Sequence, residues 1–155
     1  MGLLSFIKGV GEKIFGSSEA QAAPAEELKK EAAKHGFDMS GVDVQVNGDK
    51  VTVSGNAMSQ EEAEKIILAM GNTMGVSEID NQLAVTKAAN ESKFYTVKKG
   101  DTLWKISETM YGAGHGKDYN TIFEANKPML THPDKIYPGQ VLRIPALGGA
   151  KTAQA

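Results

Sequence analysis

The stretch "VDVQVNGDKVTVSGNAMSQEEAEKII", residues 42–67, contains the change of periodicity that decides the fold of the first half of the chain. Valine occupies every second position on either side of the sequence Asn-Gly-Asp at residues 47–49, which predicts a β-hairpin with a tight turn. Ser59 and Glu62 then have the spacing of a capping box, which opens a helix. The valines are Val42, Val44, Val46, Val51 and Val53, and the apolar face of the helix is Ala63, Ile66, Ile67 and Met70.

The flanking sequence adds three elements to this hairpin and helix. Residues 26–35 predict a short helix closed by Gly36, and Gly71 ends the second helix. A last strand is predicted over residues 79–85. The order α-β-β-α-β predicts a small α+β sandwich with its helices on one face of the sheet.

This half resembles the BON domain, a small α/β module of bacterial proteins, over residues 26–87. The resemblance rests on "VDVQVNGDKVTVSGNAMSQEEAEKIILAMGNTMGVSEIDNQLAV", with Gly55 after the second strand and the Gly75-Val76 step into the last one. These marks are mostly glycines and aliphatic residues, so they specify a fold better than a function.

Apolar residues also recur at helical spacing near the N-terminus, which predicts an amphipathic helix over residues 1–16. Such a helix either packs on the first domain, which we favour, or lies on a membrane surface. Residues 17–25, "SSEAQAAPA", are expected to be a linker. Because Lys8, Glu12 and Lys13 interrupt the apolar residues, we expect no secretory signal and a cytoplasmic location.

Composition excludes several classes of function. The chain of 155 residues has no cysteine, which excludes disulfides and thiolate metal sites. Its formal net charge of -2 argues against nucleic-acid binding, and no apolar run reaches the ~18 residues of a membrane-spanning helix. Residues 1–87 hold 8 Lys against 13 Asp and Glu, whereas residues 88–155 hold 9 Lys and Arg against 6 Asp and Glu. The two halves therefore differ in electrostatic character.

The second half follows a polar connector, residues 88–93, and runs from residue 94 to residue 145, with residues 146–155 expected to be a disordered tail. A strand at Tyr95 and Val97 precedes a helix whose inner face is Leu103, Ile106 and Met110. A second helix, which ends near Asn126, and a final strand complete a predicted β-α-α-β unit. The second helix carries Ile122, Phe123 and Ala125, and the final strand carries Val141, Leu142 and Ile144.

The blocks "YTVKKGDTLWKIS", "IFEANK" and "IYPGQVLRIP" are similar in sequence and order to a LysM domain. The resemblance implies a shallow groove for glycans that contain N-acetylglucosamine, such as peptidoglycan. Trp104 either stacks on a sugar or anchors the first helix, and the sequence leaves both readings open. The matching groove positions are Gly100, Asp101, Thr102, Leu103, Ile136, Tyr137, Pro138 and Gly139, and each of these residues also has a structural reading as a turn, cap or core residue.

No constellation in the sequence supports catalysis, so we expect the protein not to be an enzyme. The histidines at positions 35, 115 and 132 form no HExxH pattern, and we expect none to have a metal-ligand partner one helical turn away. His115 and His132 are expected to be solvated loop residues. GxSxG and P-loop patterns are both absent.

The whole arrangement resembles the bacterial cytoplasmic potassium-binding proteins of the BON/LysM type. The resemblance implies that K⁺ binds to the N-terminal segment and BON half, with larger alkali cations accepted. Backbone carbonyls suit this ion, and "KGVGE" and "MGNTMGV" are glycine-rich breaks where carbonyls can leave helical hydrogen bonding. We interpret the ligands as the main-chain oxygens of Ile7, Val10, Glu12, Gly71, Thr73 and Val76; helix capping and turns at both breaks are the alternative reading.

The same resemblance suggests a monomer that changes conformation as a K⁺ sensor or buffer, including under osmotic stress, without inserting in a membrane. Ion binding would then dock the N-terminal helix and order its contact with the LysM half. A competing hypothesis is a cell-envelope protein that holds peptidoglycan through LysM. A third is a scaffold without a ligand.

Overall fold

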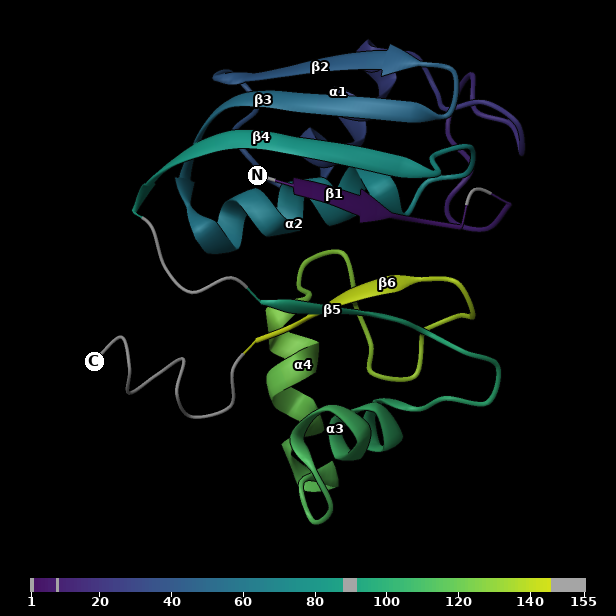
Figure 1. Ribbon diagram of the computed structural model, residues 1–155, viewed down its shortest axis with the longest axis vertical. Coiled ribbons are helices and arrows are strands. Elements are labelled where there is room, and N and C mark those ends of the chain that lie inside the picture. The colour runs from purple at the N-terminus through teal and green to yellow at the C-terminus, as the bar shows by residue number, and fades with distance from the viewer. Residues whose placement is uncertain (1, 8, 88–91, 146–155) are drawn as a thin grey trace. The chain divides into compact units, whose positions relative to one another are not determined.

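The computed structural model describes residues 2–7, 9–87 and 92–145 and divides the chain into two units, residues 1–88 and 89–155 (Figure 1). Most of the predicted connector, residues 88–91, lies outside the described residues. The predicted tail, residues 146–155, lies outside them as well. Each unit is therefore described by itself.

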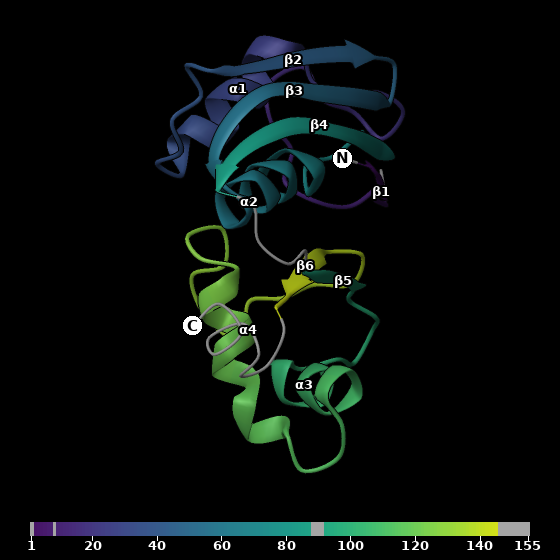
Figure 2. The ribbon, with the colours of Figure 1, turned by 60° about the vertical axis from the view of Figure 1, so that its left-hand side comes forward.

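The first unit is a four-stranded sheet with two helices on one face, as Figures 1 and 2 show. The strand order is β1-β4-β3-β2. The hairpin β2-β3 and the pair β1-β4 are antiparallel, whereas β3 and β4 are parallel and joined through α2. The elements are β1 Gly2–Ser5, α1 Ala25–Lys34, β2 Val42–Asn47, β3 Lys50–Ser59, α2 Gln60–Gly71 and β4 Glu78–Lys87.

The hairpin and the capping box form as the sequence predicts. Asn47 pairs with Lys50, so two residues make the turn, and Gly48 supplies the positive φ of 68°. The Glu62 N–H donates to Ser59 Oγ at 3.1 Å, and Glu62 Oε1 accepts from the Met58 N–H at 3.1 Å. These bonds satisfy donors at the start of α2, where the helix itself offers no acceptor.

The core of the first unit lies between the sheet and the two helices. One face of the hairpin is buried there, and the inner side of α2 is almost wholly buried as well. The alternating valines and the periodic apolar residues of α2 therefore meet in one layer, which confirms the predicted α+β sandwich. Core residues include Leu28, Val44, Val51, Val53, Ile66, Ile67, Met70 and Ile79.

The predicted N-terminal helix over residues 1–16 is wrong. Residues 2–5 instead form β1, an antiparallel edge strand in which Leu4 lies opposite Ile79 of β4. The exposure of the side chains alternates along the segment: Leu3 and Ile7 are exposed, whereas Phe6 is buried. Pairing with the free edge of β4 overrides the helical spacing, and Gly9 and Gly11 weaken a helix further along.

Residues 17–25 are not a free linker. Ala22 and Ala23 are buried, and the Ala22 N–H donates to the Gly48 carbonyl at 2.9 Å. The small side chains of Ala22 and Ala23 allow close packing of the chain on the hairpin turn, whereas residues 18–21 are exposed. The segment belongs to the first unit.

The second unit has the predicted order of elements, β-α-α-β, with a short 3₁₀ turn before the second helix. Thr102 caps the first helix, since its Oγ1 accepts the Lys105 N–H at 3.1 Å. The core joins both helices to the strand pair β5-β6 through Leu103, Ile106, Ile122, Leu142 and Ile144, among others. The elements are β5 Lys93–Thr96, α3 Leu103–Tyr111, η1 Gly116–Asp118, α4 Tyr119–Ala125 and β6 Val141–Ile144.

The helices are short in both units. The longest, α2, has 12 residues. Over the described ranges, none of the helices combines the length and the apolar character needed to cross a bilayer.

Candidate functional site

The N-terminal segment runs alongside the loop that follows α2, so the two glycine-rich breaks lie side by side. The Glu12 N–H donates to the Asn72 carbonyl at 2.9 Å, and the Met74 N–H donates to the Glu12 carbonyl at 2.8 Å. These bonds form a short parallel bridge between Glu12 and Thr73. Upstream, the Phe6 N–H donates to the Ser77 carbonyl at 2.9 Å. The first unit therefore brings together two parts of the chain that lie far apart in sequence.

Two glycines permit this close approach. Gly11 has a φ of 103°, and a Cβ on it would stand 2.6 Å from the Asn72 carbonyl oxygen. Gly71 lies beneath the ring of Phe6, where a Cβ would meet the ring carbons. A side chain at either position would push the N-terminal segment away from the end of α2.

The six predicted carbonyl ligands lie on these two segments, three on each. Glu12 and Thr73 are direct neighbours across the bridge. Three of the six carbonyl oxygens already accept a hydrogen bond: that of Ile7 from Val10, that of Glu12 from Met74 and that of Thr73 from Val76. A carbonyl oxygen has two lone pairs, so these bonds leave one available for a cation. Gly71 ends α2, and Val10 and Val76 lie in the adjoining turns.

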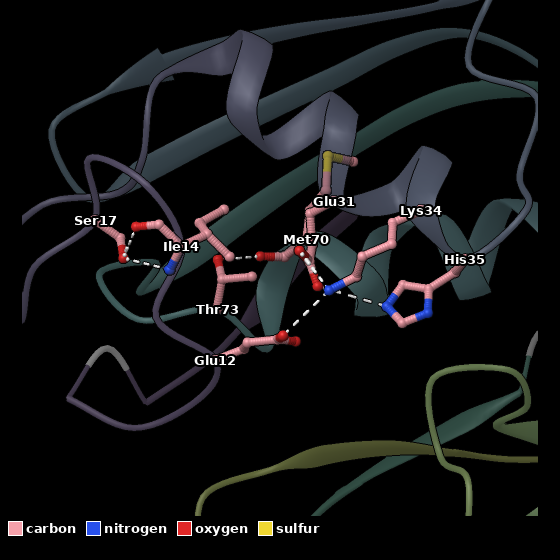
Figure 3. Close-up of polar contacts among 8 residues, drawn as sticks. All are labelled: Glu12, Ile14, Ser17, Glu31, Lys34, His35, Met70 and Thr73. Carbon is pink, nitrogen blue, oxygen red and sulfur yellow. Dashed lines mark hydrogen bonds and ion pairs between the residues drawn. The ribbon is translucent and has the colours of Figure 1, made fainter.

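The electrostatics at the end of α2 favour a cation. The helix ends at Gly71, and its last turn carries no basic residue. Free carbonyls at a helix C-terminus carry partial negative charge, which a cation stabilises. The buried Thr73 donates its hydroxyl to the Met70 carbonyl at 2.6 Å, which fixes the loop that leaves the helix (Figure 3).

A side-chain cluster that was not predicted from the sequence adjoins the bridge. Glu31 and His35 lie one helical turn apart at the end of α1, and both face the Glu12 side chain (Figure 3). The expectation that no histidine has a ligand partner at this spacing is therefore wrong for His35. The Glu-x-x-x-His spacing was visible in the sequence, but only the fold brings Glu12 to it.

The charges of this cluster perturb one another. Burial raises the pKa of the Glu31 carboxyl, and the neighbouring Glu12 carboxylate adds to the rise. Burial also acts to raise the pKa of Glu12, but contacts with Glu31 and Lys34 outweigh it and lower that pKa overall. The Lys34 Nζ lies 3.2 Å from Glu12 Oε2 and 3.2 Å from Glu31 Oε1. Both contacts raise the pKa of Lys34, although its partial desolvation opposes them.

In the second unit, the two loops predicted to form a glycan groove lie at the same end of the strand pair. The Val97 N–H donates to the Gln140 carbonyl, and the Gly139 N–H donates back to the Val97 carbonyl, each at 2.8 Å. One loop, from Gly100 to Leu103, follows β5; the other, from Ile136 to Gly139, precedes β6. Leu103 is part of the core, and Ile136 packs against it.

A pocket of about 380 Å³ opens beside the first of these loops. Trp104 is 49% exposed, and its ring lies 6.2 Å from that of Tyr119, centroid to centroid. The pocket lining includes Thr102 and Leu103 from the predicted groove, and also residues that the sequence analysis did not select. Those are Tyr119, His132, Pro133 and Asp134; Trp104, already a candidate for stacking on a sugar, lines the pocket as well, and His132 was expected only to be a solvated loop residue.

Comparison with known proteins gives two matching family models. The BON domain model matches residues 21–87, and the LysM domain model matches residues 95–145. The potassium binding protein Kbp of Escherichia coli is 48% identical over 149 residues, which cover 94% of this chain and 99% of that protein. An uncharacterized protein of Deinococcus radiodurans is 35% identical over 115 residues, 67% of this chain and 44% of its own length. The spore coat assembly protein ExsA of Bacillus cereus is 39% identical over 54 residues, 35% of this chain and 8% of that protein.

Proposed function

Because this chain belongs to the BON/LysM family that includes the potassium binding protein Kbp, we propose that it binds K⁺ through the first unit. The ligands are main-chain oxygens of Ile7, Val10 and Glu12 from the N-terminal segment, and of Gly71, Thr73 and Val76 from the end of α2 and its loop. Larger alkali cations are also accepted. The protein acts in the cytoplasm as a K⁺ sensor or buffer, including under osmotic stress, and not as an enzyme.

The observation that carries this proposal is the pairing of the two glycine-rich segments at Glu12 and Thr73. K⁺ is large and weakly hydrated, so neutral carbonyl oxygens can replace its water shell. Carboxylate-rich cages instead suit Ca²⁺ and Mg²⁺. The end of α2, whose last turn carries no basic residue, and the net negative charge of residues 1–87 add attraction for a cation.

Binding of an ion between these segments also gives a mechanism for a conformational response. A ligand stabilises the state that binds it. The N-terminal segment is held by a few backbone hydrogen bonds and by Phe6, so its attachment is the element that K⁺ reinforces. In the K⁺-free state, the segment is expected to separate more often from the loop after α2.

Isothermal titration calorimetry with KCl, compared with NaCl at matched ionic strength, tests the proposal. The wild-type chain is expected to give saturable heat with K⁺ and only dilution heat with Na⁺. Gly11→Ala is expected to weaken K⁺ binding, because the added methyl group collides with the Asn72 carbonyl. Gly114→Ala is the matched control, since Gly114 also has a positive φ but has open space around it and lies in the second unit.

Glu12→Gln separates main-chain from side-chain ligation. Because the proposed ligand is the Glu12 carbonyl, the amide variant is expected to retain K⁺ binding. Equal heats with both salts, or loss of K⁺ binding in Glu12→Gln with unchanged folding, would contradict the assignment of the ligands.

We also propose that the second unit takes a glycan containing N-acetylglucosamine. The pocket beside Trp104 supports this, because an exposed indole offers a flat apolar surface to a sugar ring. We expect the wild-type chain to be retained on insoluble peptidoglycan and Trp104→Ala to be retained less. Equal retention of the wild type and Trp104→Ala would exclude Trp104 as the surface on which the sugar stacks. If the wild type is retained and is also found in the envelope fraction of cells, the envelope hypothesis would be favoured over the cytoplasmic one.

A further inference from the structure

The side chains of Glu12, Glu31 and His35 form a compact set of potential metal ligands. One donor atom from each lies within 4.8 Å of the others. Two carboxylates and one imidazole are a different chemistry from the main-chain carbonyls assigned to K⁺. Imidazole nitrogen with carboxylate oxygen is a donor set suited to Zn²⁺ and similar divalent transition metals.

Elements of the fold hold these three side chains in place. Glu31 and His35 are four residues apart, so they project from the same side of α1. Glu12 comes from the N-terminal segment, and its main chain is fixed by hydrogen bonds to Asn72 and Met74. The fold therefore fixes the main chain at these positions, whereas the Glu12 side chain itself is 52% exposed.

Glu31 provides an independent observation that points to a cation. Its side chain is only 6% exposed, and its Oε2 is buried without a hydrogen-bond donor among the residues that the structure describes. This oxygen lies 3.5 Å from His35 Nε2, beyond the usual ~2.7–2.9 Å of a charge-assisted hydrogen bond. A carboxylate oxygen buried without a donor is costly, and either a proton shared with Glu12 or a metal ion between the two carboxylates would relieve that cost.

Lys34 occupies part of the same space, but it can leave. Its ammonium group contacts both carboxylates, so one positive charge faces two negative ones. The Lys34 and Glu12 side chains are 56% and 52% exposed, so their ion pair contributes little to stability. The contact with the buried Glu31 is the one that the metal has to replace. If Lys34 turns into solvent, the two carboxylates present a charge that one divalent ion neutralises.

We propose that Glu12, Glu31 and His35 bind a divalent transition-metal ion of the Zn²⁺ type, with Lys34 displaced by the metal. Metal–ligand bonds of about 2.0–2.2 Å require the donors to approach by roughly 1 Å, which side-chain rotation provides. Three protein ligands leave a fourth position for water. The bound metal joins the N-terminal segment to α1, and this site stands whether or not K⁺ binds.

Calorimetric titration of the intact chain with ZnCl₂ in K⁺-free buffer tests the proposal. The wild-type chain is expected to bind one equivalent. Glu31→Gln, which keeps the shape of the side chain, and His35→Ala are each expected to weaken binding by about tenfold or more, since the loss of even an outer-shell partner costs 10–100-fold. Thermal unfolding without metal verifies that each variant folds, and Glu31→Gln decides the question if His35→Ala does not.

Lys34→Gln gives a prediction of opposite sign. Because it removes the internal competitor, this variant is expected to bind Zn²⁺ more tightly than the wild type. Glu27→Gln is the matched control on α1, because Glu27 has its own lysine partner, Lys30, at 3.5 Å. His115→Ala and His132→Ala are expected to retain binding, although each histidine lies beside a carboxylate.

The assignment would be overturned by no saturable Zn²⁺ binding in the wild type, by unchanged binding in folded Glu31→Gln, or by loss of binding in His115→Ala or His132→Ala. A parallel KCl titration of Glu31→Gln keeps this test apart from the K⁺ proposal. If Glu31→Gln still gives binding heat with K⁺ but gives none with Zn²⁺, the result supports two sites of different chemistry. Loss of both would overturn the separate site.

Discussion

Asp101 holds the loop after β5 in its shape. Its Oδ2 accepts hydrogen bonds from the Tyr95 hydroxyl at 2.7 Å and from the Lys98 N–H at 2.8 Å. Desolvation acts to raise the pKa of Asp101, but these hydrogen bonds and nearby lysines outweigh it and lower that pKa. Burial and the same carboxylate raise the pKa of Tyr95 to about 12. Asp101 therefore supports the predicted groove by holding the loop after β5 in its shape.

This contact predicts a dependence of stability on pH. Because the folded-state pKa of Asp101 lies below its ordinary value of 3.8, its contribution is complete above that value. The contribution is lost as the pH falls through the folded-state pKa. The difference in unfolding free energy between wild type and Asp101→Asn is therefore expected to be constant near neutral pH and to shrink below about pH 4.

Urea unfolding between about pH 6 and about pH 2 measures this difference. Asp134→Asn is the control, because the Asp134 side chain is 90% exposed and its replacement is expected to change stability by less than ~0.5 kcal/mol. A difference for Asp101→Asn that does not vary with pH would show that the carboxylate charge makes no contribution.

At this scale, the sequence predicts some roles better than others. Thr102 and Ser59 were predictable as caps or as part of a capping box because capping depends on local spacing. The cluster of Glu12, Glu31 and His35 was not, because it depends on where the N-terminal segment packs. Main-chain ligands are harder still to predict, because the identity of a side chain does not indicate what the carbonyl oxygen of that residue binds.

At the scale of elements, the hairpin, both helices of the first unit and the β-α-α-β unit were predictable. Each depends on local signals that agree with one another: alternation, a tight turn, a capping box and helical periodicity. The strand β1 was mistaken for a helix, because its apolar residues fit helical spacing and its partner, β4, lies far along the chain. An edge strand of four residues has too short a pattern to outweigh that spacing.

The attachment of the N-terminal segment is expected to depend on Phe6. Its ring is buried above Gly71, so Phe6→Ala is expected to destabilise the first unit by about 3–5 kcal/mol. Leu3→Ala is the matched control from β1, since Leu3 is 68% exposed, and it is expected to cost less than ~1 kcal/mol. Denaturant unfolding followed by circular dichroism measures both. Equal effects of the two variants would show that burial of Phe6 does not anchor the segment.

At the scale of the whole molecule, the chain has two units of different charge and different chemistry. The first unit, residues 1–88, contains the bridge proposed to hold K⁺ and the cluster proposed to hold a divalent metal. The second, residues 89–155, contains the pocket beside Trp104. The response to K⁺ is therefore expected to begin in the first unit, at the junction of its N-terminal segment with the loop after α2.

The most direct test of this account is the amide NMR spectrum of the ¹⁵N-labelled chain, titrated with KCl and with NaCl at matched ionic strength. The account predicts saturable shifts with K⁺ at residues 9–12 and 71–77, and small, unsaturated shifts at the same amides with Na⁺. Shifts of equal size in both salts, or K⁺-specific shifts confined to residues 92–145, would contradict it.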